Sequence, residues 1–393
     1  MDHLYIVHYG EIGLKGKNRP DFEIQLADNI RAQHAVSRVE RLRGRLTVHG
    51  TRPLDLSNVF GIAWWAGVTP VDATVEAIRR EGLAIAKERI GDSPSFAVRT
   101  SRADKSFPLR SQELERLVGG DLDEALDVPV DLDDPAFTLN IEIAEGSAYL
   151  YTDRHEGPRG LPAGISGRLL GLYSAGIDSA VAAYLMGKRG ASVELVHFHA
   201  LTAAEHADEQ KAGRLARKIA GFFPSIRVHY VPYHHFQMAT LGLDRYQRQE
   251  LVVFRRFMAR AATKLAEQRR ALALFSGDNL GQVASQTLEN LVAVDQSIGR
   301  SIFRPLIAYD KQEIIDLGKR LDFDEIANES YKDCCSIIAQ HPATRANLKL
   351  VRQIEEDIGV DELVDASLDE SVTYEYVSTD EGVAVRSAEV IGT

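Results

Sequence analysis

GRLLGLYSAGIDS, residues 167–179, combines an apolar strand, a short loop of small residues and the first turn of a helix. The small residues 174–176 allow the backbone to fold closely around an anion, and the free N–H groups at the start of the helix point toward that anion. Asp178 and Ser179 add polar side chains at the same place. The segment predicts a phosphate-binding turn at the end of a strand, and an ordinary strand–turn–helix junction is the alternative.

The loop resembles the PP-loop SGGxDS, the pyrophosphate-binding loop of enzymes that split ATP between its α- and β-phosphates. It is not the P-loop of kinases and GTPases, because the Lys-Ser/Thr ending is absent. We therefore expect the ATP phosphates at Ser174, Gly176 and Ser179, with Asp178 helping to hold a magnesium ion or orienting the nucleotide. Ala175 stands where the PP-loop usually has glycine, and its methyl group is a small perturbation that the loop tolerates if φ stays negative. We expect that changing Ala175 to glycine alters ATP affinity only modestly.

The composition is that of a folded protein with two or three domains. The chain has 393 residues, 45% of them apolar, and no stretch long and apolar enough to span a bilayer. Asp2 lies where a signal peptide would carry basic residues. The two cysteines, Cys334 and Cys335, are adjacent and cannot form a disulfide framework. We therefore expect a cytoplasmic protein.

The net charge of −11 at first argues against nucleic acid, but overall charge describes solubility better than it describes local contacts. Acidic side chains are concentrated in the C-terminal stretch, whereas basic side chains gather in clusters within 15–19, 99–110 and 245–270. Separate basic clusters on an acidic protein favour selective contact with RNA, and solvated helix faces are the alternative. The residues that we expect to contact RNA are Lys15, Lys17, Arg19, Arg99, Arg102, Lys105 and Arg110.

The pattern of apolar residues changes along the chain. Up to residue 154, short strands and helices follow one another as in two small α+β domains, the first of the ferredoxin-like kind. From residue 168, strands and helices alternate regularly, which predicts a doubly wound parallel sheet with its ligand at the carboxyl ends of the strands. We expect domains at 1–57 and 58–154, a Gly- and Pro-rich linker at 155–167 and an α/β domain at 168–393.

Further motifs resemble one known family. SGDNLGQVASQT, residues 276–287, resembles the TGExLGQxxSQT segment of the tRNA 4-thiouridine synthetases, the ThiI sulfurtransferase family, with Ser276 and Asp278 in place of Thr and Glu. Three other segments resemble that family's cysteine segment, its N-terminal opening and its RNA-binding THUMP domain: YKDCCS (331–336), GEIGLKGKNR (10–19) and SFAVRTSRADKSFPLRSQEL (95–114). The resemblance covers essentially the whole chain, because these motifs occur in separate regions and in the right order.

The resemblance implies a ferredoxin-like domain and a THUMP domain, followed by a PP-loop ATP pyrophosphatase domain. It implies an ATP-dependent tRNA sulfurtransferase that adenylates a tRNA uridine and then transfers persulfide sulfur to give 4-thiouridine. ATP and Mg²⁺ are the expected cofactors, the ion neutralising charge on the phosphates. The ATP contacts that the resemblance adds are Leu172, Tyr173, His197, Phe198, Arg255, Gly277 and Gln286.

Cys335 aligns with the family's catalytic cysteine, which would carry the sulfur as a persulfide. A buried pair of inert thiols at Cys334 and Cys335 is the alternative. Some family members append a rhodanese domain with a second active cysteine, and this chain resembles the short form without one. The sulfur is therefore expected from a cysteine desulfurase, from another persulfide carrier or from sulfide. The expected partners also include tRNA and a second copy of the chain, and sulfur transfer toward thiamine biosynthesis is associated with the family.

Two other functions remain as alternatives at this point. Another PP-loop enzyme that adenylates a different RNA base or a small molecule would share residues 174–179 but would not need Cys335. A tRNA-binding module that has lost catalysis would keep the basic clusters without pyrophosphate release.

Overall fold

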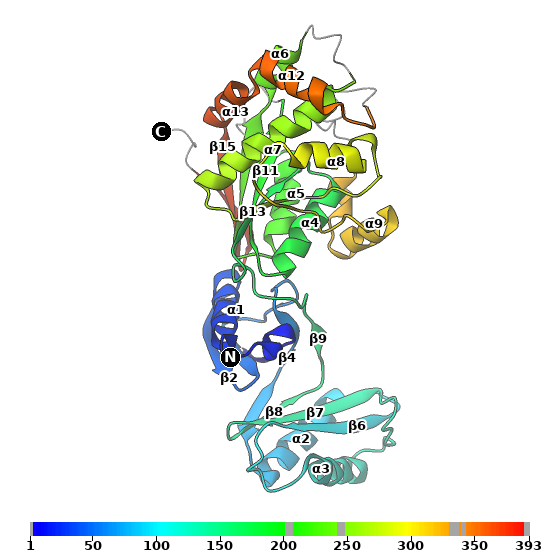
Figure 1. Ribbon diagram of the computed structural model, residues 1–393. Helices are drawn as coiled ribbons and strands as arrows, with labels where there is room; N and C mark the ends of the chain where they lie inside the picture. The colour runs from blue at the N-terminus through cyan, green and yellow to red at the C-terminus, as the bar shows by residue number, and fades with distance from the viewer. Residues whose placement is uncertain (1–2, 201–206, 242–247, 330–337, 339–342, 389–393) are drawn as a thin grey trace. The chain divides into compact units, whose positions relative to one another are not determined.

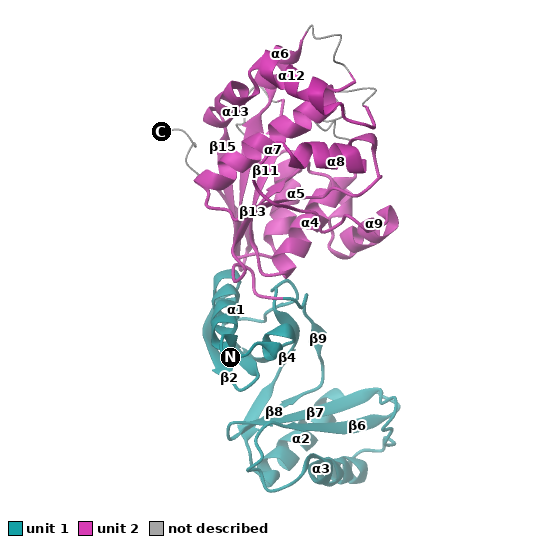
Figure 2. Cartoon of the chain, viewed as in Figure 1, with its two compact units in different colours: residues 1–160 teal, residues 161–393 magenta. Residues whose placement is uncertain are grey.

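The chain forms two compact units, a first unit of residues 1–160 and a second unit of residues 161–393 (Figure 2). No helix in the described part of the chain is long and apolar enough to cross a membrane. The computed structural model describes residues 3–200, 207–241, 248–329, 338 and 343–388.

The first unit begins with an antiparallel sheet and one long helix. Its elements are β1 (His3–Tyr9), the short 3-10 helix η1 (Glu11–Leu14), α1 (Arg19–Gln33), β2 (Val36–Leu42), β3 (Arg45–Gly50), β4 (Ile62–Gly67) and β9 (His155–Glu156). The strand order is β2-β3-β1-β4-β9, so the stretch expected as a linker begins as an edge strand of this sheet. Val7 of β1 is buried in one core with Leu26 and Ile30 of α1.

The rest of the first unit has four strands and two helices. Its elements are β5 (Thr69–Asp72), α2 (Val75–Arg89), β6 (Phe96–Arg102), α3 (Ser111–Ala125), β7 (Phe137–Ala144) and β8 (Ser147–Tyr151). The strand order is β5-β8-β7-β6, in which β6 and β7 are parallel and the other pairs antiparallel. Leu139 and Ile141 are two positions apart on β7 and therefore face the same core, which they share with Ile78 of α2 and Leu114 of α3.

A buried polar cluster joins the two sheets of the first unit. Glu142 of β7 is 1% exposed, lies 3.0 Å from His8 Nε2 and forms an ion pair with Arg45. Trp64 stacks on His8 with ring centroids 4.0 Å apart, and the Arg154 guanidinium lies 4.5 Å from the centroid of the same indole. Burial, followed by the charges of Arg45 and Arg154, lowers the pKa of His8 to about 3, so this histidine is neutral near pH 7.

The second unit is built on a seven-stranded sheet (Figure 1). Its strands are β10 (Arg168–Leu172), β11 (Ser192–His199), β12 (Ser225–Pro232), β13 (Ala273–Ser276), β14 (Ile302–Phe303), β15 (Val372–Thr379) and β16 (Gly382–Ala388). The order is β14-β13-β10-β11-β12-β15-β16. The first five strands in this order are parallel, which confirms the doubly wound arrangement, and the antiparallel hairpin β15–β16 extends the sheet beyond what the alternation predicts.

Helices cover both faces of this sheet. α4 (Ile177–Lys188), α5 (Lys211–Ala220), α9 (Lys311–Arg320) and α10 (Asp324–Ala327) form one layer. The opposite layer contains α6 (His234–Thr240), α7 (Glu250–Gln268), α8 (Leu288–Asp295), α12 (Leu348–Ile358) and α13 (Val360–Asp369). α7 lies at the centre of its layer, where it contacts α8, α12 and α13. Its Phe254 and Phe257 are fully buried in one core with Leu170 of β10 and Val196 of β11.

A buried carboxylate links several strands on the second unit's sheet. Glu194 of β11 accepts from Arg269 Nε at 2.9 Å and lies 2.9 Å from His229 Nε2 of β12, whose Nδ1 is 2.8 Å from Thr373 Oγ1 of β15. Arg168 of β10 approaches the same carboxylate at 3.4 Å. Burial alone would raise the pKa of Glu194, but the hydrogen bonds with His229 and Arg269 outweigh burial and lower it to about 2.

We expect Glu194→Gln to lower the free energy of unfolding at pH 7 by about 2–3 kcal/mol, because His229 and Arg269 then lose a buried anionic partner. The lowered pKa means that the carboxylate stabilises the fold fully above its ordinary value near 4.5 and loses this effect as the pH falls toward about 2. Urea unfolding of both proteins from pH 7 to pH 3 measures the difference, which should shrink over the acid part of this range.

Glu375→Gln is the matched control, because Glu375 pairs with Arg227 on the same sheet but is partly exposed. Its effect should stay below about 1 kcal/mol. Equal effects of the two substitutions, or a Glu194 effect that does not change with pH, would contradict the assignment.

Candidate active site

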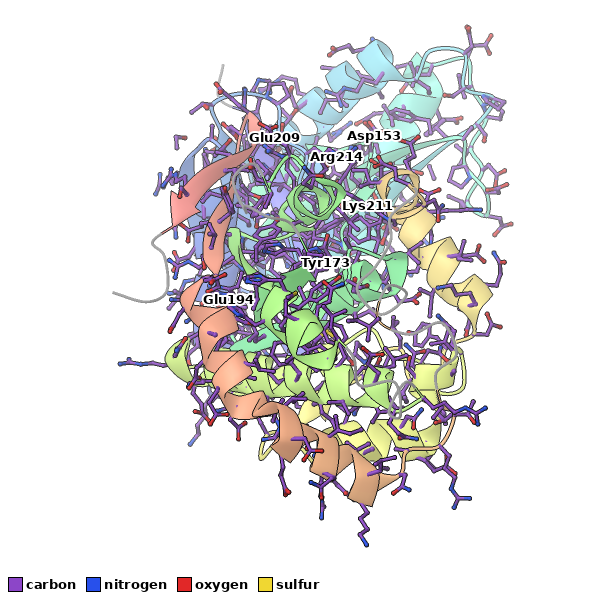
Figure 3. The ribbon with its side chains drawn as sticks, turned by 90° about the horizontal axis from the view of Figure 1, so that it is seen from above. Asp153, Tyr173, Glu194, Glu209, Lys211 and Arg214 are labelled. Carbon is purple, nitrogen blue, oxygen red and sulfur yellow. The ribbon has the colours of Figure 1, made fainter. Side chains whose placement is uncertain are left out.

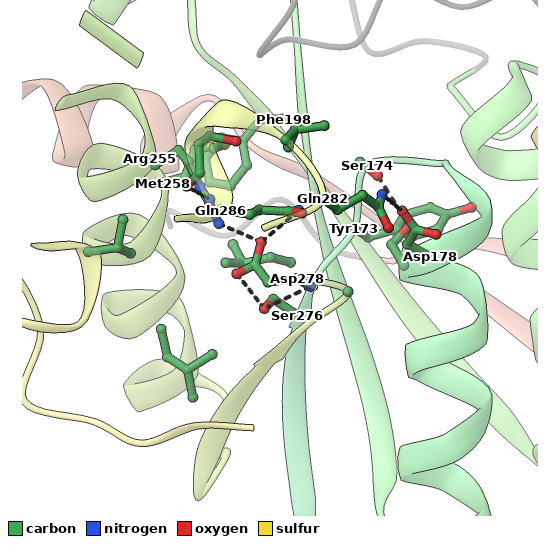
Figure 4. Close-up of a pocket in the computed structure, with 17 residues that line it drawn as sticks. Tyr173, Ser174, Asp178, Phe198, Arg255, Met258, Ser276, Asp278, Gln282 and Gln286 are labelled. Carbon is green, nitrogen blue, oxygen red and sulfur yellow. Dashed lines mark hydrogen bonds and ion pairs between the residues drawn. The ribbon is translucent and has the colours of Figure 1, made fainter. Parts of the chain in front are cut away.

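A pocket of about 260 Å³ lies at the carboxyl ends of β10 and β13 (Figure 4). β10 has β11 on one side and β13 on the other, so the direction in which successive strands are added reverses here. Doubly wound sheets bind their ligands at such a switch point. The residues expected at the site that line this pocket are Leu172, Tyr173, Ser174, Asp178, Ser179, Phe198, Arg255, Gly277 and Gln286.

The loop between β10 and α4 differs from expectation at two residues, Ala175 and Gly176. Gly176 is the N-cap of α4 and lies beside the pocket rather than in its lining, and Ser179 Oγ donates to the Gly176 carbonyl at 2.9 Å. Ala175 is fully buried and has a φ of +60°, so the condition of a negative φ, under which its methyl group would cost little, is not met. The tight turn from strand to helix places this residue in the left-handed region, where an L-residue costs about 1–2 kcal/mol.

Gly277 follows β13 and passes against the first turn of α4. A Cβ atom at this position would lie 2.7 Å from both the carbonyl carbon of Asp178 and the amide nitrogen of Ser179. These are backbone atoms, which cannot move aside as the end of a side chain can. Glycine is therefore required for the two loops to close over one pocket.

Asp178 is held by two side chains that sequence reasoning missed. Lys311 Nζ, at the start of α9, donates to Asp178 Oδ1 at 2.6 Å, and Gln282 Nε2 donates to Oδ2 at 2.9 Å. Gln282 lies within the quoted 276–287 motif, so the motif carried a signal for it. Lys311 follows an Asp310 capping box that marks a helix start, but nothing local connects this lysine with Asp178.

A second carboxylate, Asp278, organises the opposite side of the pocket. It accepts from Arg255 Nη2 at 2.6 Å and from Ser276 Oγ at 2.8 Å, and Arg304 Nε lies 3.4 Å away. Gln286 Nε2 is 3.3 Å from the same carboxylate. Burial would raise the pKa of Asp278, but the positive charge of Arg255, with the contacts from Ser276 and Arg304, keeps it below its ordinary value. Asp278 is therefore ionised and paired.

The remaining wall of the pocket is apolar. Leu172 and Phe198 come from the ends of β10 and β11, Met258 from α7, and Val294 and Ile302 from α8 and β14. An apolar wall beside convergent polar groups and the free N–H groups of a helix start suits a molecule with a flat ring and an anionic tail.

Three family models match successive parts of the chain. Residues 4–65 match the ThiI ferredoxin-like domain, residues 72–153 the THUMP domain, and residues 164–360 the family described as thiamine biosynthesis protein (ThiI). A probable tRNA sulfurtransferase of Brevibacillus brevis is 36% identical over 92% of this chain and 93% of its own length. The corresponding protein of Thermus thermophilus is 36% identical over 96% of this chain and 95% of its own length.

The chain belongs to the ThiI family of tRNA sulfurtransferases. Solved structures agree with this assignment. A 4-thiouridine synthetase crystallised with RNA and bound ATP superposes with a TM-score of 0.84 at 30% identity, covering 99% of this chain and 100% of that one. The protein PH1313 of Pyrococcus horikoshii gives a TM-score of 0.64 at 27% identity, covering 81% of this chain and 99% of that one.

His197, expected from the family resemblance as an ATP contact, does not line the pocket. Its side chain is buried on the strand β11, with Nδ1 2.9 Å from the Tyr173 carbonyl oxygen, and its ring lies near those of Tyr173 and Tyr230. Burial lowers the pKa of His197 to about 4, so the ring is neutral near pH 7. This geometry gives His197 a role in fixing the end of β10.

The basic residues expected to contact RNA differ in their contacts within the protein. Arg19 Nη2 donates to the Gly13 carbonyl at 2.6 Å, and Arg102 Nη1 donates to the carbonyls of Phe107 and Leu109 at 2.8 and 2.6 Å. These two arginines therefore support loops of the first unit. Arg99 is exposed and also donates to a loop carbonyl, that of Leu132. Lys15 is partly buried over the Phe22 ring, and the remaining three are exposed: Lys17, Lys105 and Arg110.

The sulfur chemistry expected of this family falls outside the described residues. Cys334 and Cys335, with the motif around them, belong to the segment 330–337, which the structure does not describe. The described chain stops before this segment at Glu329 and continues beyond it at Ile338 and then from Ala343.

Replacing Ala175 by glycine should change the free energy of unfolding by no more than about 1 kcal/mol. Relief of the left-handed strain, about 1–2 kcal/mol, is offset by the greater flexibility of glycine in the unfolded chain and by the loss of a buried methyl group. Ala175→Val should cost more than about 2 kcal/mol, because a β-branched residue fits neither the positive φ nor the buried position. Urea unfolding measures both, and similar stabilities for the two variants would contradict the left-handed geometry.

Gly277→Ala should weaken ATP binding at least about tenfold, because the added methyl group displaces the first turn of α4, where Asp178 and Ser179 line the pocket. Isothermal titration with a non-hydrolysable ATP analogue measures the affinity. Gly299→Ala is the control, since a Cβ there meets nothing within 4 Å. An unchanged affinity in Gly277→Ala would show that the close approach does not shape the nucleotide site.

Proposed function

We propose that this chain is an ATP-dependent tRNA sulfurtransferase that converts a tRNA uridine to 4-thiouridine. The observation that carries the proposal is the pocket in which the PP-loop and the loop after β13 meet, in a chain of the ThiI family. The family membership supports the overall reaction, and the geometry of the pocket supports its first half, the activation of the substrate by ATP.

The lining of the pocket supports one orientation of the nucleotide in this proposal. The triphosphate lies against the loop 174–176 and the N-terminus of α4, where glycine as N-cap leaves backbone N–H groups available. The adenine lies against the apolar wall that includes Leu172 and Phe198. Arg255 acts mainly by holding the loop after β13, because its guanidinium donates to Asp278 and to the Ser285 carbonyl.

Magnesium is expected to enter with the phosphates. Asp178 and Asp278 are the carboxylates among the described residues that line the pocket, and both are engaged, with Lys311 and Gln282 on one and Arg255 and Arg304 on the other. This donor set does not form a preassembled magnesium site. Magnesium bound to nucleotides keeps several waters and takes few protein ligands, which is compatible with such a pocket.

The chemistry follows from the poor leaving ability of a carbonyl oxygen. The uracil O4 attacks the α-phosphorus of ATP and pyrophosphate leaves, so that O4 becomes part of an adenylate. The outer sulfur of a persulfide on Cys335 then attacks C4 and AMP leaves. A thiol reductant supplies the two electrons that break the remaining S–S bond and restore the cysteine thiolate. Asp178, held by Lys311, is placed to orient the phosphates during the first step.

The first unit is proposed to bind the tRNA. Its THUMP domain and its exposed cations support contact with the RNA backbone, which predicts strong dependence on salt and little reading of base edges. The uridine has to leave its stack to reach the pocket. The proposal further includes a persulfide donor, such as a cysteine desulfurase. It also takes the protein to be a homodimer in the cytoplasm. The family description also supports a second role, in which the protein supplies sulfur for thiamine biosynthesis.

The test separates the two halves of the reaction. With unmodified tRNA, ATP, cysteine and a cysteine desulfurase, the wild-type protein should release pyrophosphate and form 4-thiouridine. Cys335→Ser should keep tRNA-dependent pyrophosphate release and lose 4-thiouridine, whereas Cys334→Ser should keep both. Mass analysis of the nucleosides and a pyrophosphate assay measure the two outputs.

Full thiolation by Cys335→Ser would favour another adenylating enzyme that does not use a sulfur relay. No pyrophosphate release by the wild-type protein at any salt concentration would favour a tRNA-binding module without catalysis. In cells, loss of the gene should remove 4-thiouridine from tRNA.

A further inference from the structure

The first turn of α5 lies between the nucleotide pocket and the chain that leads into the cysteine segment. Tyr173, which lines the pocket, donates its hydroxyl hydrogen to the Ala212 carbonyl of α5 at 2.9 Å. Lys211 and Arg214 flank this contact on the same helix (Figure 3). The helix is thus fixed relative to the pocket at the turn that carries these two cations.

Both cations hold the last described residues before the cysteine segment. Lys211 Nζ donates to the carbonyls of Ala327 and Glu329, at 2.8 and 3.0 Å. Arg214 forms a two-point ion pair with the Glu329 carboxylate, one contact being 2.8 Å. Main chain and side chain of Glu329 are therefore both anchored to α5.

The far end of the segment is anchored to elements that also border the pocket. The Asn290 side chain of α8 donates to the Ala343 carbonyl at 2.9 Å, and the Ala343 N–H donates to the Arg248 carbonyl at 2.8 Å. Thr287, the N-cap of α8, donates to the Thr344 carbonyl at 2.7 Å. Thr287 directly follows Gln286, which lines the pocket.

These contacts contribute little to the stability of the fold. The side chains of Arg214 and Glu329 are 45% and 39% exposed, and an ion pair of such exposure contributes about 0–1 kcal/mol to folding. Lys211 is the first residue of α5, where a positive charge is unfavourable to the helix itself. The main physical effect of Lys211 and Arg214 is therefore to hold Glu329 in one place relative to α5.

We infer that Lys211 and Arg214 are positioning residues for sulfur transfer, which set the place from which the cysteine segment starts relative to the nucleotide. The inference rests on the proposed function of Cys335. Cys335 follows Glu329 by six positions, so the chain between them spans at most about 20 Å. The contacts to Lys211 and Arg214 fix Glu329, and with it the point at which the segment that carries Cys335 begins. The adenylation step depends on the pocket and is independent of this anchor.

The test compares the two half-reactions in the full-length protein. Lys211→Gln with Arg214→Gln should slow 4-thiouridine formation about tenfold, while tRNA-dependent pyrophosphate release stays within about twofold of wild type. The melting temperature should change little, because all of these contacts except the partly buried one from Lys211 to Ala327 are exposed. The assay uses unmodified tRNA, ATP, cysteine and a cysteine desulfurase, with the desulfurase in excess.

A matched control and a rescue make the test specific. Lys218→Gln removes another exposed ion pair of α5, with Asp322, and should leave both half-reactions unchanged. Arg214→Glu alone should slow thiolation, and Arg214→Glu with Glu329→Arg should restore it, because the ion pair is re-formed with its charges exchanged.

Three outcomes would overturn the inference: unchanged thiolation in the double glutamine variant, an equal loss of pyrophosphate release and thiolation, or no rescue by the charge exchange. Failure of the proposed function would look different, because the wild-type protein itself would then form no 4-thiouridine.

Discussion

The rest of the site depends on the close approach of two backbones, at Gly277 and at the first turn of α4. β10 and β13 are hydrogen-bonded neighbours, so the loops that leave them must share the space above one edge of the sheet. Because residue 277 has no side chain, these loops close over a single pocket. The loop after β13 can then bring Gln282 to Asp178 and Asp278 to Arg255. Strand pairing and one missing side chain together place groups from α4, α7 and the loop after β13 around the same volume.

Much of this arrangement could be predicted because its signals are local. An apolar strand, small residues and a polar first turn occur together in residues 167–179, and the alternation of strands and helices orders the parallel sheet. The hairpin of β15 and β16 was not predicted. Its pairing joins Val372–Thr379 to β12, far away in the sequence, and no local pattern reports such a register. The acidic character of the C-terminal stretch describes its surface and says nothing about its partner strand.

The features that sequence reasoning missed depend on tertiary contact. Lys311 and Asp178 are 133 positions apart, and only the packing of α9 beside α4 brings them together. The left-handed conformation of Ala175 follows from the direction in which α4 leaves the sheet, whereas alanine usually indicates a helical φ. His197 was within reach of simple reasoning. Neighbouring residues on a strand face opposite sides, so His197 and Phe198 cannot both point into the same pocket.

The pairing of both pocket carboxylates has a consequence for how a nucleotide is selected. A triphosphate carries several negative charges, and an unpaired aspartate at either position would repel it before any contact formed. Here Lys311 pairs with one carboxylate, and Arg255 pairs with the other, which Arg304 also approaches while it pairs more closely with Asp295. Any nucleoside triphosphate is therefore free to approach, and charge gives no preference among bases. Discrimination between adenine and other bases is left to the shape of the apolar wall and to the amide side chains at its rim.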